Sequence, residues 1–191
     1  MAARPPAVAR PLTLVDLMIL VAATALGCAG ILRFGITAGE LSSLFADVIA
    51  GRWSGELGLQ LAILSLPFGL AWTLALIALR LRRPRPPWRI LARQPGFLAA
   101  CMAGLAFAGL LLPLLGGILL GVAPSDRVQV LAAASFGLAA AAMLSGAWLT
   151  LIVTRRWRAE RSWPDRLGRA LGAYWIAQGA VAAIVILFWL Q

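Results

Sequence analysis

The stretch that decides the fold is LGLQLAILSLPFGLAWTLALIAL, residues 57–79, which runs directly into RLRRPRPPWRILAR, residues 80–93. The first part carries no charge and is long enough to cross a bilayer, which takes about 20 helical residues at about 1.5 Å each. The second part carries six arginines and three prolines but no acidic residue. An uncharged apolar run that ends in a basic block predicts a transmembrane helix with a charged anchor at one end.

Four further segments have the same apolar character, namely residues 12–32, 97–123, 128–154 and 170–190. Within all five segments the only charged residue is Asp16, near the start of the first. Backbone amides find no water in the hydrocarbon core, so a segment that spans it folds as a helix rather than an open strand. The sequence therefore predicts an all-α fold, an integral membrane helical bundle with five transmembrane helices that forms one membrane domain over residues 1–191.

The composition favours a membrane protein over a soluble one. Of the 191 residues, 62% are hydrophobic and 13% are charged, whereas a soluble domain is roughly half apolar and about a quarter charged. The net charge of +10 is, by itself, also typical of nucleic-acid binders, whose basic side chains neutralise phosphates. The apolar content outweighs that alternative, and we expect no nucleic-acid partner.

The arginines alternate between rich and poor segments along the chain. Fourteen of the seventeen lie in the N-terminal tail, in the loop 80–96 and in the loop 155–169. Arginine-rich segments stay in the cytoplasm, so the pattern predicts a protein of the cell inner (cytoplasmic) membrane with its N-terminus inside and its C-terminus outside.

Arginines beside a bilayer also attract anionic lipid headgroups, at about 1 kcal/mol each. Anionic headgroups at the inner face are therefore the expected lipid partners. The residues predicted to contact them are Arg80, Arg82, Arg83, Arg85, Arg89, Arg155, Arg156 and Arg158.

The segment TAGELSSLFADVIAG, residues 37–51, predicts a short amphipathic helix over about 37–50, on the outer surface. Thr37 and Glu40 have the spacing of a capping box, and Gly51 is a suitable stop. One apolar face is formed by Leu41, Leu44, Phe45, Val48 and Ile49. Such a helix either roofs the bundle or acts as a lid over a substrate path, and we favour the roof because surface helices commonly rest at the interface.

Few polar residues in the apolar segments suggest chemistry. Thr13 and Asp16 also have capping-box spacing, which favours a helix cap over a proton relay. Gln60 and Gln178 both lie within apolar segments and are the candidates for lining a polar cavity.

The N-terminus allows a second interpretation, as a signal peptide. It has a basic start, an apolar run and small residues, so that cleavage near Ala23 to Ala25 is an alternative. Because the apolar run is longer than the hydrophobic region of a typical signal peptide, we expect a retained helix.

Motifs of common enzyme classes are missing from the sequence. It has no G-x-S-x-G, no H-E-x-x-H, no phosphate-binding glycine loop, no Cys/His cluster and no histidine at all. We therefore predict no catalytic, metal or cofactor residues and no cofactor. A membrane-embedded enzyme is the least favoured class.

The class favoured instead is a structural or accessory subunit of a membrane complex, with a membrane protein or a second copy of the chain as partner. The alternative is a small transporter or permease component for an apolar or anionic solute. A dry bundle with Gln60 and Gln178 bonded to helix backbones would favour the subunit, and a continuous polar cavity would favour the transporter.

The stretch LTLVDLMILVAATALG, residues 12–27, resembles the N-terminal helix of small multi-pass membrane proteins of uncharacterised activity from GC-rich bacteria. This resemblance implies the membrane class and brings no site residue with it.

Overall fold

The structure, a computed structural model, describes residues 12–33, 38–52, 54–82, 87–119, 126–160 and 162–189. Within these ranges the chain forms α-helices and no strand, which confirms the all-α prediction. The five long helices are α1 (Leu14–Arg33), α3 (Gly55–Leu81), α5 (Pro95–Leu119), α6 (Asp126–Val153) and α7 (Trp163–Trp189), and the two short ones are α2 (Ala38–Ile49) and α4 (Trp88–Leu91).

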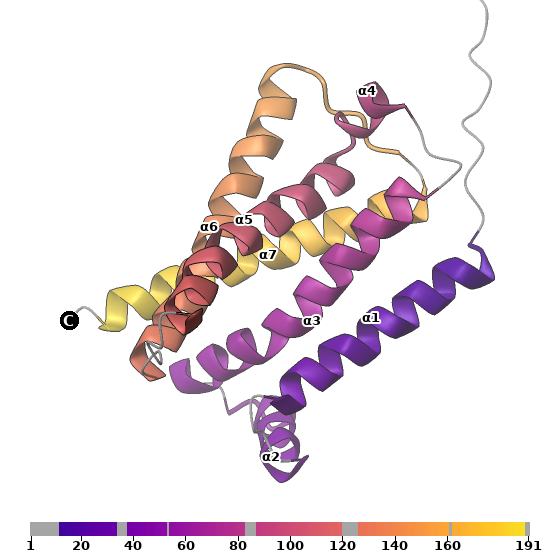
Figure 1. The fold of residues 1–191 in the computed structure, drawn as a ribbon. Coiled ribbons are helices and arrows are strands. Elements are labelled where there is room, and N and C mark those ends of the chain that lie inside the picture. Colours follow the sequence, from indigo (N-terminus) through magenta and orange to yellow (C-terminus); the bar gives the residue numbers. More distant parts are fainter. Residues whose placement is uncertain are drawn as a thin grey trace, which may run out of the picture.

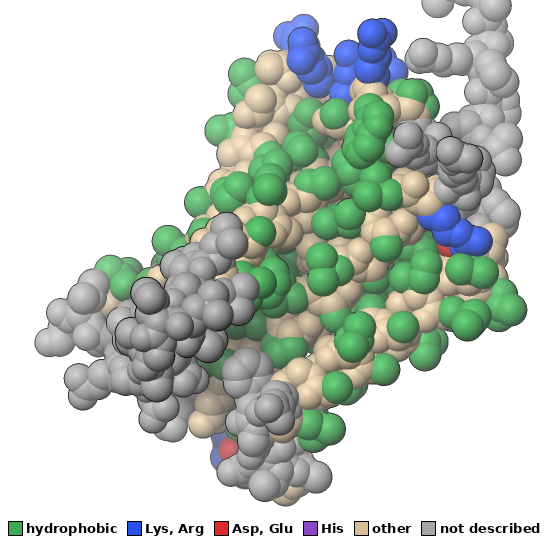
Figure 2. All heavy atoms as spheres, viewed as in Figure 1, with side chains coloured by type: hydrophobic (Ala, Val, Ile, Leu, Met, Phe, Trp, Pro, Cys, Tyr) green, Lys and Arg blue, Asp and Glu red, His purple; other side chains and the backbone are tan. Residues whose placement is uncertain are grey.

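The long helices alternate in direction along the chain (Figure 1). Helices α1, α5 and α7 begin at one end of the bundle, and α3 and α6 finish there. We call this the arginine end, because it carries Arg80, Arg82, Arg89, Arg93, Arg155, Arg156, Arg158, Arg166 and Arg169. In Figure 2 basic side chains gather at the top of the molecule, while hydrophobic side chains cover the flank below them.

Four of the long helices pack together and the fifth lies at the edge. Helices α5, α6 and α7 pack against one another, and α3 packs against α5 and α7. Helix α1 packs mainly along α3, on the outside of the bundle (Figure 1). Among the described residues, most of the surface of α1 is therefore not covered by another helix.

The core centres on Trp175 of α7, whose side chain is fully buried. Its ring meets Phe136 of α6 edge to face, with 5.1 Å between centroids, and its indole Nε1 donates a hydrogen bond to Thr73 Oγ1 of α3 at 3.1 Å. Ala103 and Ala140 belong to the same buried cluster. Small side chains let helices approach closely, so one large ring can link three neighbouring helices.

Three helices are long and apolar enough to cross a membrane, over Leu14–Leu32, Gln60–Leu81 and Ala134–Val153 in the part of the chain that the structure describes. A shorter apolar stretch covers Pro95–Gly109 of α5. The structure is thus compatible with a membrane location, while the predicted spans 97–123 and 170–190 stay predictions.

Helix α2 matches the predicted range 37–50 and lies at the opposite end from α4 (Figure 1). It ends at Ile49, and the predicted stop Gly51 lies two residues further on, where its positive φ of 69° allows the Gly51 amide to donate to Val48 O and the Arg52 amide to donate to Asp47 O. The predicted Thr37–Glu40 cap falls outside the described residues and side chains.

Candidate functional site at the arginine end

The predicted headgroup arginines do not form one uniform group. Arg89, Arg155, Arg156 and Arg158 are exposed, as a headgroup contact requires, and Arg82 is partly exposed. Arg83 and Arg85 lie outside the described residues. Arg80 differs from all of these because it is buried.

The buried position of Arg80 does not fit the interpretation as a headgroup contact. Its side chain is only 6% exposed, and its Nη1 pairs with Glu160 Oε2 at 3.1 Å. Its Nη2 donates to Ser162 Oγ at 3.3 Å and lies 3.7 Å from Asp165 Oδ1. Arg80 therefore joins the last turn of α3 to the chain segment that enters α7. An arginine just beyond an apolar run looks like an anchor in the sequence, and only its acidic partners reveal this other role.

Asp165 is the centre of this buried network, and no local sequence pattern indicated its contacts with other helices. Its Oδ1 accepts the amide of Gly96 at 3.1 Å, and its Oδ2 accepts the amide of Glu160 at 3.0 Å. Arg169 Nε lies 3.4 Å from Oδ2. Gly96 is in the first turn of α5, so a carboxylate of α7 caps the N-terminus of a different helix.

Several opposing effects act on the carboxyl group of Asp165. Burial is the largest of them and raises its pKa, and the Glu160 and Gly96 amides and the guanidinium groups of Arg80 and Arg169 offset only part of that rise. These contacts hold the carboxyl group in a structural joint.

Two glycines bring α5 and α7 into backbone contact at the same joint. A Cβ atom on Gly168 would lie 2.5 Å from the carbonyl oxygen of Gly96, and one on Gly96 would lie 2.4 Å from the carbonyl oxygen of Asp165. Neither position has room for a side chain. The two helix starts are therefore in direct backbone contact at this point.

Asp16 forms a second junction at the arginine end. Its amide donates to Thr13 Oγ1 at 3.3 Å while its Oδ2 accepts the Thr13 amide at 3.1 Å, which confirms the predicted capping box. Its Oδ1 also pairs with Arg82 Nη1 at 3.2 Å. The fully buried carboxylate therefore connects the start of α1 to the end of α3.

The two glutamines predicted as cavity candidates lie in different environments. Gln60 is exposed, whereas Gln178 is buried. Gln178 Nε2 donates to Ala62 O at 2.9 Å and to the Tyr174 hydroxyl at 2.8 Å, and also contacts Ser65 Oγ. Its side-chain amide nitrogen thus bridges α7 to the backbone of α3.

A small cavity beside Gln178 has a volume of about 20 Å³, room for about one water molecule. The other residues that line it are Ala62, Ile63, Leu66, Ala134, Gly137, Val181 and Ala182. Gln60 is absent from this lining, so the two glutamines do not share the cavity.

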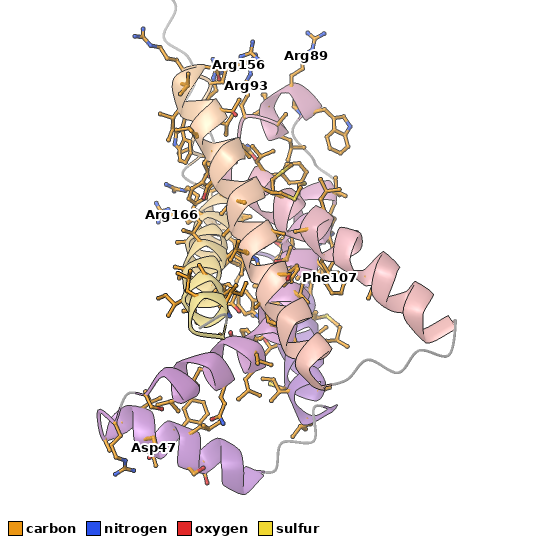
Figure 3. All side chains as sticks on the ribbon, turned by 90° about the vertical axis from the view of Figure 1, so that its left-hand side faces the viewer. Asp47, Arg89, Arg93, Phe107, Arg156 and Arg166 are labelled. Carbon is orange, nitrogen blue, oxygen red and sulfur yellow. The ribbon has the colours of Figure 1, made fainter. Side chains whose placement is uncertain are left out.

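A larger hollow of about 300 Å³ lies at the arginine end, lined mainly by basic and polar side chains. It is bounded by α4, the turn after α4, the end of α6 and the chain that follows α6. The lining residues are Arg89, Ala92, Arg93, Thr150, Leu151, Thr154 and Arg156. Figure 3 shows Arg89, Arg93 and Arg156 at the same end of the molecule. We call this feature the arginine hollow; it includes Arg93, which the sequence did not single out.

The wall of the arginine hollow is shaped by the turn after α6. Arg155 adopts a positive φ of 53°, and the amide of Arg156 donates back to Leu151 O at 2.9 Å. The amide of Arg158 then donates to Arg93 O at 3.1 Å. These bonds hold the segment from Arg155 to Arg158 against the turn before α5, so that Arg156 and Arg93 line one space.

The described residues contain no group of three or more histidine, cysteine, aspartate or glutamate side chains that suits a metal ion. Comparisons with protein families, curated proteins and solved structures found no match for the chain.

Proposed function

We propose that the protein is a five-span integral membrane protein that serves as a structural or accessory subunit of a membrane complex. The observation that carries this proposal is the outward-facing apolar surface of its long helices. In the most apolar 18-residue stretch of α1, only 17% of the residues are buried. The corresponding shares in α3 and α6 are 28% each. Apolar surface on this scale needs lipid or a membrane partner to cover it.

The alternation of helix direction supports five spans rather than three. Helices α3 and α6 both finish at the arginine end, so the intervening chain must return to the other side, and α5 makes that return. Helix α7 leaves the arginine end again and packs along both α5 and α6. With 25 and 27 residues, α5 and α7 are about 37 and 40 Å long at about 1.5 Å per residue, enough to cross a bilayer of about 30 Å.

The charge distribution supports an orientation with the arginine end in the cytoplasm. The basic loops between the spans lie at this end, and such loops are retained on the cytoplasmic side. Helix α2, with Phe45 and Ile49 exposed, then lies on the outer side, where its apolar face can rest on the bilayer. The proposed location is the cell inner membrane.

In the interior of the bundle, Gln178 meets the criterion for a subunit rather than a small transporter, whereas Gln60 is exposed and does not meet it. Gln178 uses its side-chain nitrogen to bond α3, and the cavity beside it holds about one water molecule. At the arginine end, the buried ion pairs of Arg80 with Glu160 and Asp165 join α3 to the start of α7. These features suit a rigid bundle that presents its surface to a partner.

The test is purification of the tagged full-length protein in a mild detergent, followed by measurement of its mass by light scattering. We expect a complex that contains a membrane protein partner or a second copy of the chain in fixed ratio. An unrelated membrane protein with the same tag controls for carry-over. A monomer without a partner would contradict the proposal, and chloride flux into proteoliposomes would favour the transporter.

A further inference from the structure

We propose that the arginine hollow binds the phosphate group of an anionic phospholipid in the inner leaflet. This inference rests on the proposed function, because it requires that the arginine end lie at the headgroup level of a membrane. It goes further by assigning one defined site in place of a diffuse basic surface.

The first support is the uncompensated positive charge of the hollow. Arg89, Arg93 and Arg156 line it, and among the described residues none of the three forms an ion pair. Three arginines that line one space bring positive charges into the same region, and an anion bound there is attracted by all three.

The acidic side chains of the same end are already engaged elsewhere. Glu160 and Asp165 pair with Arg80, and Asp16 pairs with Arg82. No acidic residue lines the hollow. The complementary charge must therefore come from a ligand or from solvent ions.

The second support is the chemistry of the donors. Each guanidinium group presents five N–H donors in a planar fork that suits phosphate oxygens. The two threonine hydroxyls already donate within α6, Thr150 to Gly146 O at 2.8 Å and Thr154 to Thr150 O at 2.6 Å. The arginines are thus the donors available to an anion, and the threonines form a neutral wall.

The third support is the surface beside the hollow, which favours a lipid over a free anion. Leu149, Ile152 and Val153 of α6 are exposed, at 62%, 58% and 72%. They share the last turns of α6 with Thr150, Leu151 and Thr154, which line the hollow. A basic hollow next to an exposed apolar strip matches a molecule with a phosphate head and an acyl tail.

Helix α4, on the other side of the hollow, has the character of an interfacial element. Trp88 and Ile90 are exposed, at 54% and 42%, and Arg89 lies between them in the chain. Tryptophan prefers the headgroup level of a membrane. The arginine hollow is therefore expected at the depth of lipid phosphates.

The experiment is native mass spectrometry of the full-length protein titrated with phosphatidylglycerol or with phosphatidylcholine. Arg93→Gln/Arg156→Gln removes two lining arginines, and Arg52→Gln/Arg166→Gln removes the same charge from exposed arginines that neither line the hollow nor belong to the predicted headgroup contacts. We expect the first variant to lose about thirtyfold in affinity for phosphatidylglycerol at low salt, from about 1 kcal/mol per arginine. The second should lose less than about threefold.

Arg89→Gln, a single change on α4, provides an independent variant in case the double substitution disturbs folding, which circular dichroism would reveal. It should weaken phosphatidylglycerol binding about fivefold. Equal losses in the lining and non-lining double variants would overturn the site in favour of general surface charge. Equal affinity of the wild type for phosphatidylglycerol and phosphatidylcholine would also overturn it.

Inorganic phosphate distinguishes the two sources of the phosphate group. If it displaces phosphatidylglycerol at millimolar concentration and binds with equal affinity, the ligand is a free anion and the lipid assignment is wrong. Failure of the membrane orientation is separate, because it would be detected by topology reporters and would leave these binding measurements in detergent unaffected.

Discussion

At the scale of single residues, Asp165 holds the arginine end together. Its carboxylate accepts amides from Gly96 and Glu160 and lies within ion-pair distance of Arg80 and Arg169. Each of these groups belongs to a different turn of the chain. Loss of the carboxylate would remove one of the two acidic partners of the buried Arg80 and would leave the amides of Gly96 and Glu160 without their acceptor.

We predict that Asp165→Ala lowers the free energy of unfolding by about 3–5 kcal/mol, the usual cost of removing one partner of a buried ion pair. The matched control is Asp47→Ala, which removes the exposed ion pair with Arg52 at the opposite end, and should cost about 1 kcal/mol or less. Both changes in the free energy of unfolding can be measured by unfolding the variants in mixed micelles with increasing dodecyl sulfate. Equal effects of the two substitutions would contradict the central role of Asp165.

Arg155 is a second residue whose conformation leads to a prediction. Its φ of 53° lies in the left-handed region, which costs a residue with a side chain about 1–2 kcal/mol and glycine almost nothing. Arg155→Gly should therefore raise the free energy of unfolding by about 0.5–1 kcal/mol.

Ser145→Gly is the control for Arg155→Gly, because Ser145 is an exposed position within α6. There glycine should lower stability by about half a kcal/mol through its poor helix propensity. Thermal unfolding followed by circular dichroism should thus show a higher melting temperature for Arg155→Gly and a lower one for Ser145→Gly. A loss of stability for Arg155→Gly would show that the arginine side chain itself holds the turn.

At the scale of helices, the contact of α5 with α7 depends on glycine. Gly168→Ala would place a Cβ atom 2.5 Å from the carbonyl oxygen of Gly96, so the two helix starts must separate. We expect a loss of about 1–3 kcal/mol, typical of overpacking. Unfolding in mixed micelles would measure it.

Gly146→Ala provides a matched comparison, because a Cβ atom there meets nothing within 4 Å and alanine favours the helix by about 1 kcal/mol. Gly168→Ala should therefore lower the free energy of unfolding, whereas Gly146→Ala should raise it. A neutral Gly168→Ala variant would mean that α5 and α7 can move apart without cost at this crossing.

The sequence predicted the long helices well where apolar residues define them. The run 57–79 corresponds to α3, Gly55–Leu81, and the run 128–154 corresponds to α6, Asp126–Val153. The start of α7 was predicted at 170 but lies at Trp163. Its first turns contain Asp165, Arg166 and Arg169, and a search for apolar runs passes over such charged turns.

The contacts of the candidate site were less predictable than its helices. The capping box of Thr13 and Asp16 is local in sequence, and its spacing was sufficient to predict it. The pairing of Arg80 with Asp165 joins residues of two helices, and the hydrogen bond from Gly96 to Asp165 does the same. Such contacts depend on how α3, α5 and α7 pack, which no local pattern encodes.

At the scale of the whole molecule, the two ends of the bundle differ in their charge and in their exposed side chains. One end carries nine described arginines and two junctions built on buried carboxylates, while the other carries α2 with its exposed apolar side chains. This difference between the two ends is most favourable in a bilayer whose inner leaflet is anionic. The proposed five spans require the two chain termini to lie on opposite sides of it.

The most direct test of this central claim is a topology assay with paired reporters, green fluorescent protein and alkaline phosphatase, each fused to the full-length chain at Gln191 and within residues 84–87. We predict phosphatase activity without fluorescence at Gln191, and fluorescence without phosphatase activity within residues 84–87. Fluorescence at Gln191 would contradict it, because the C-terminus would then lie in the cytoplasm and the number of spans could not be five with the N-terminus inside.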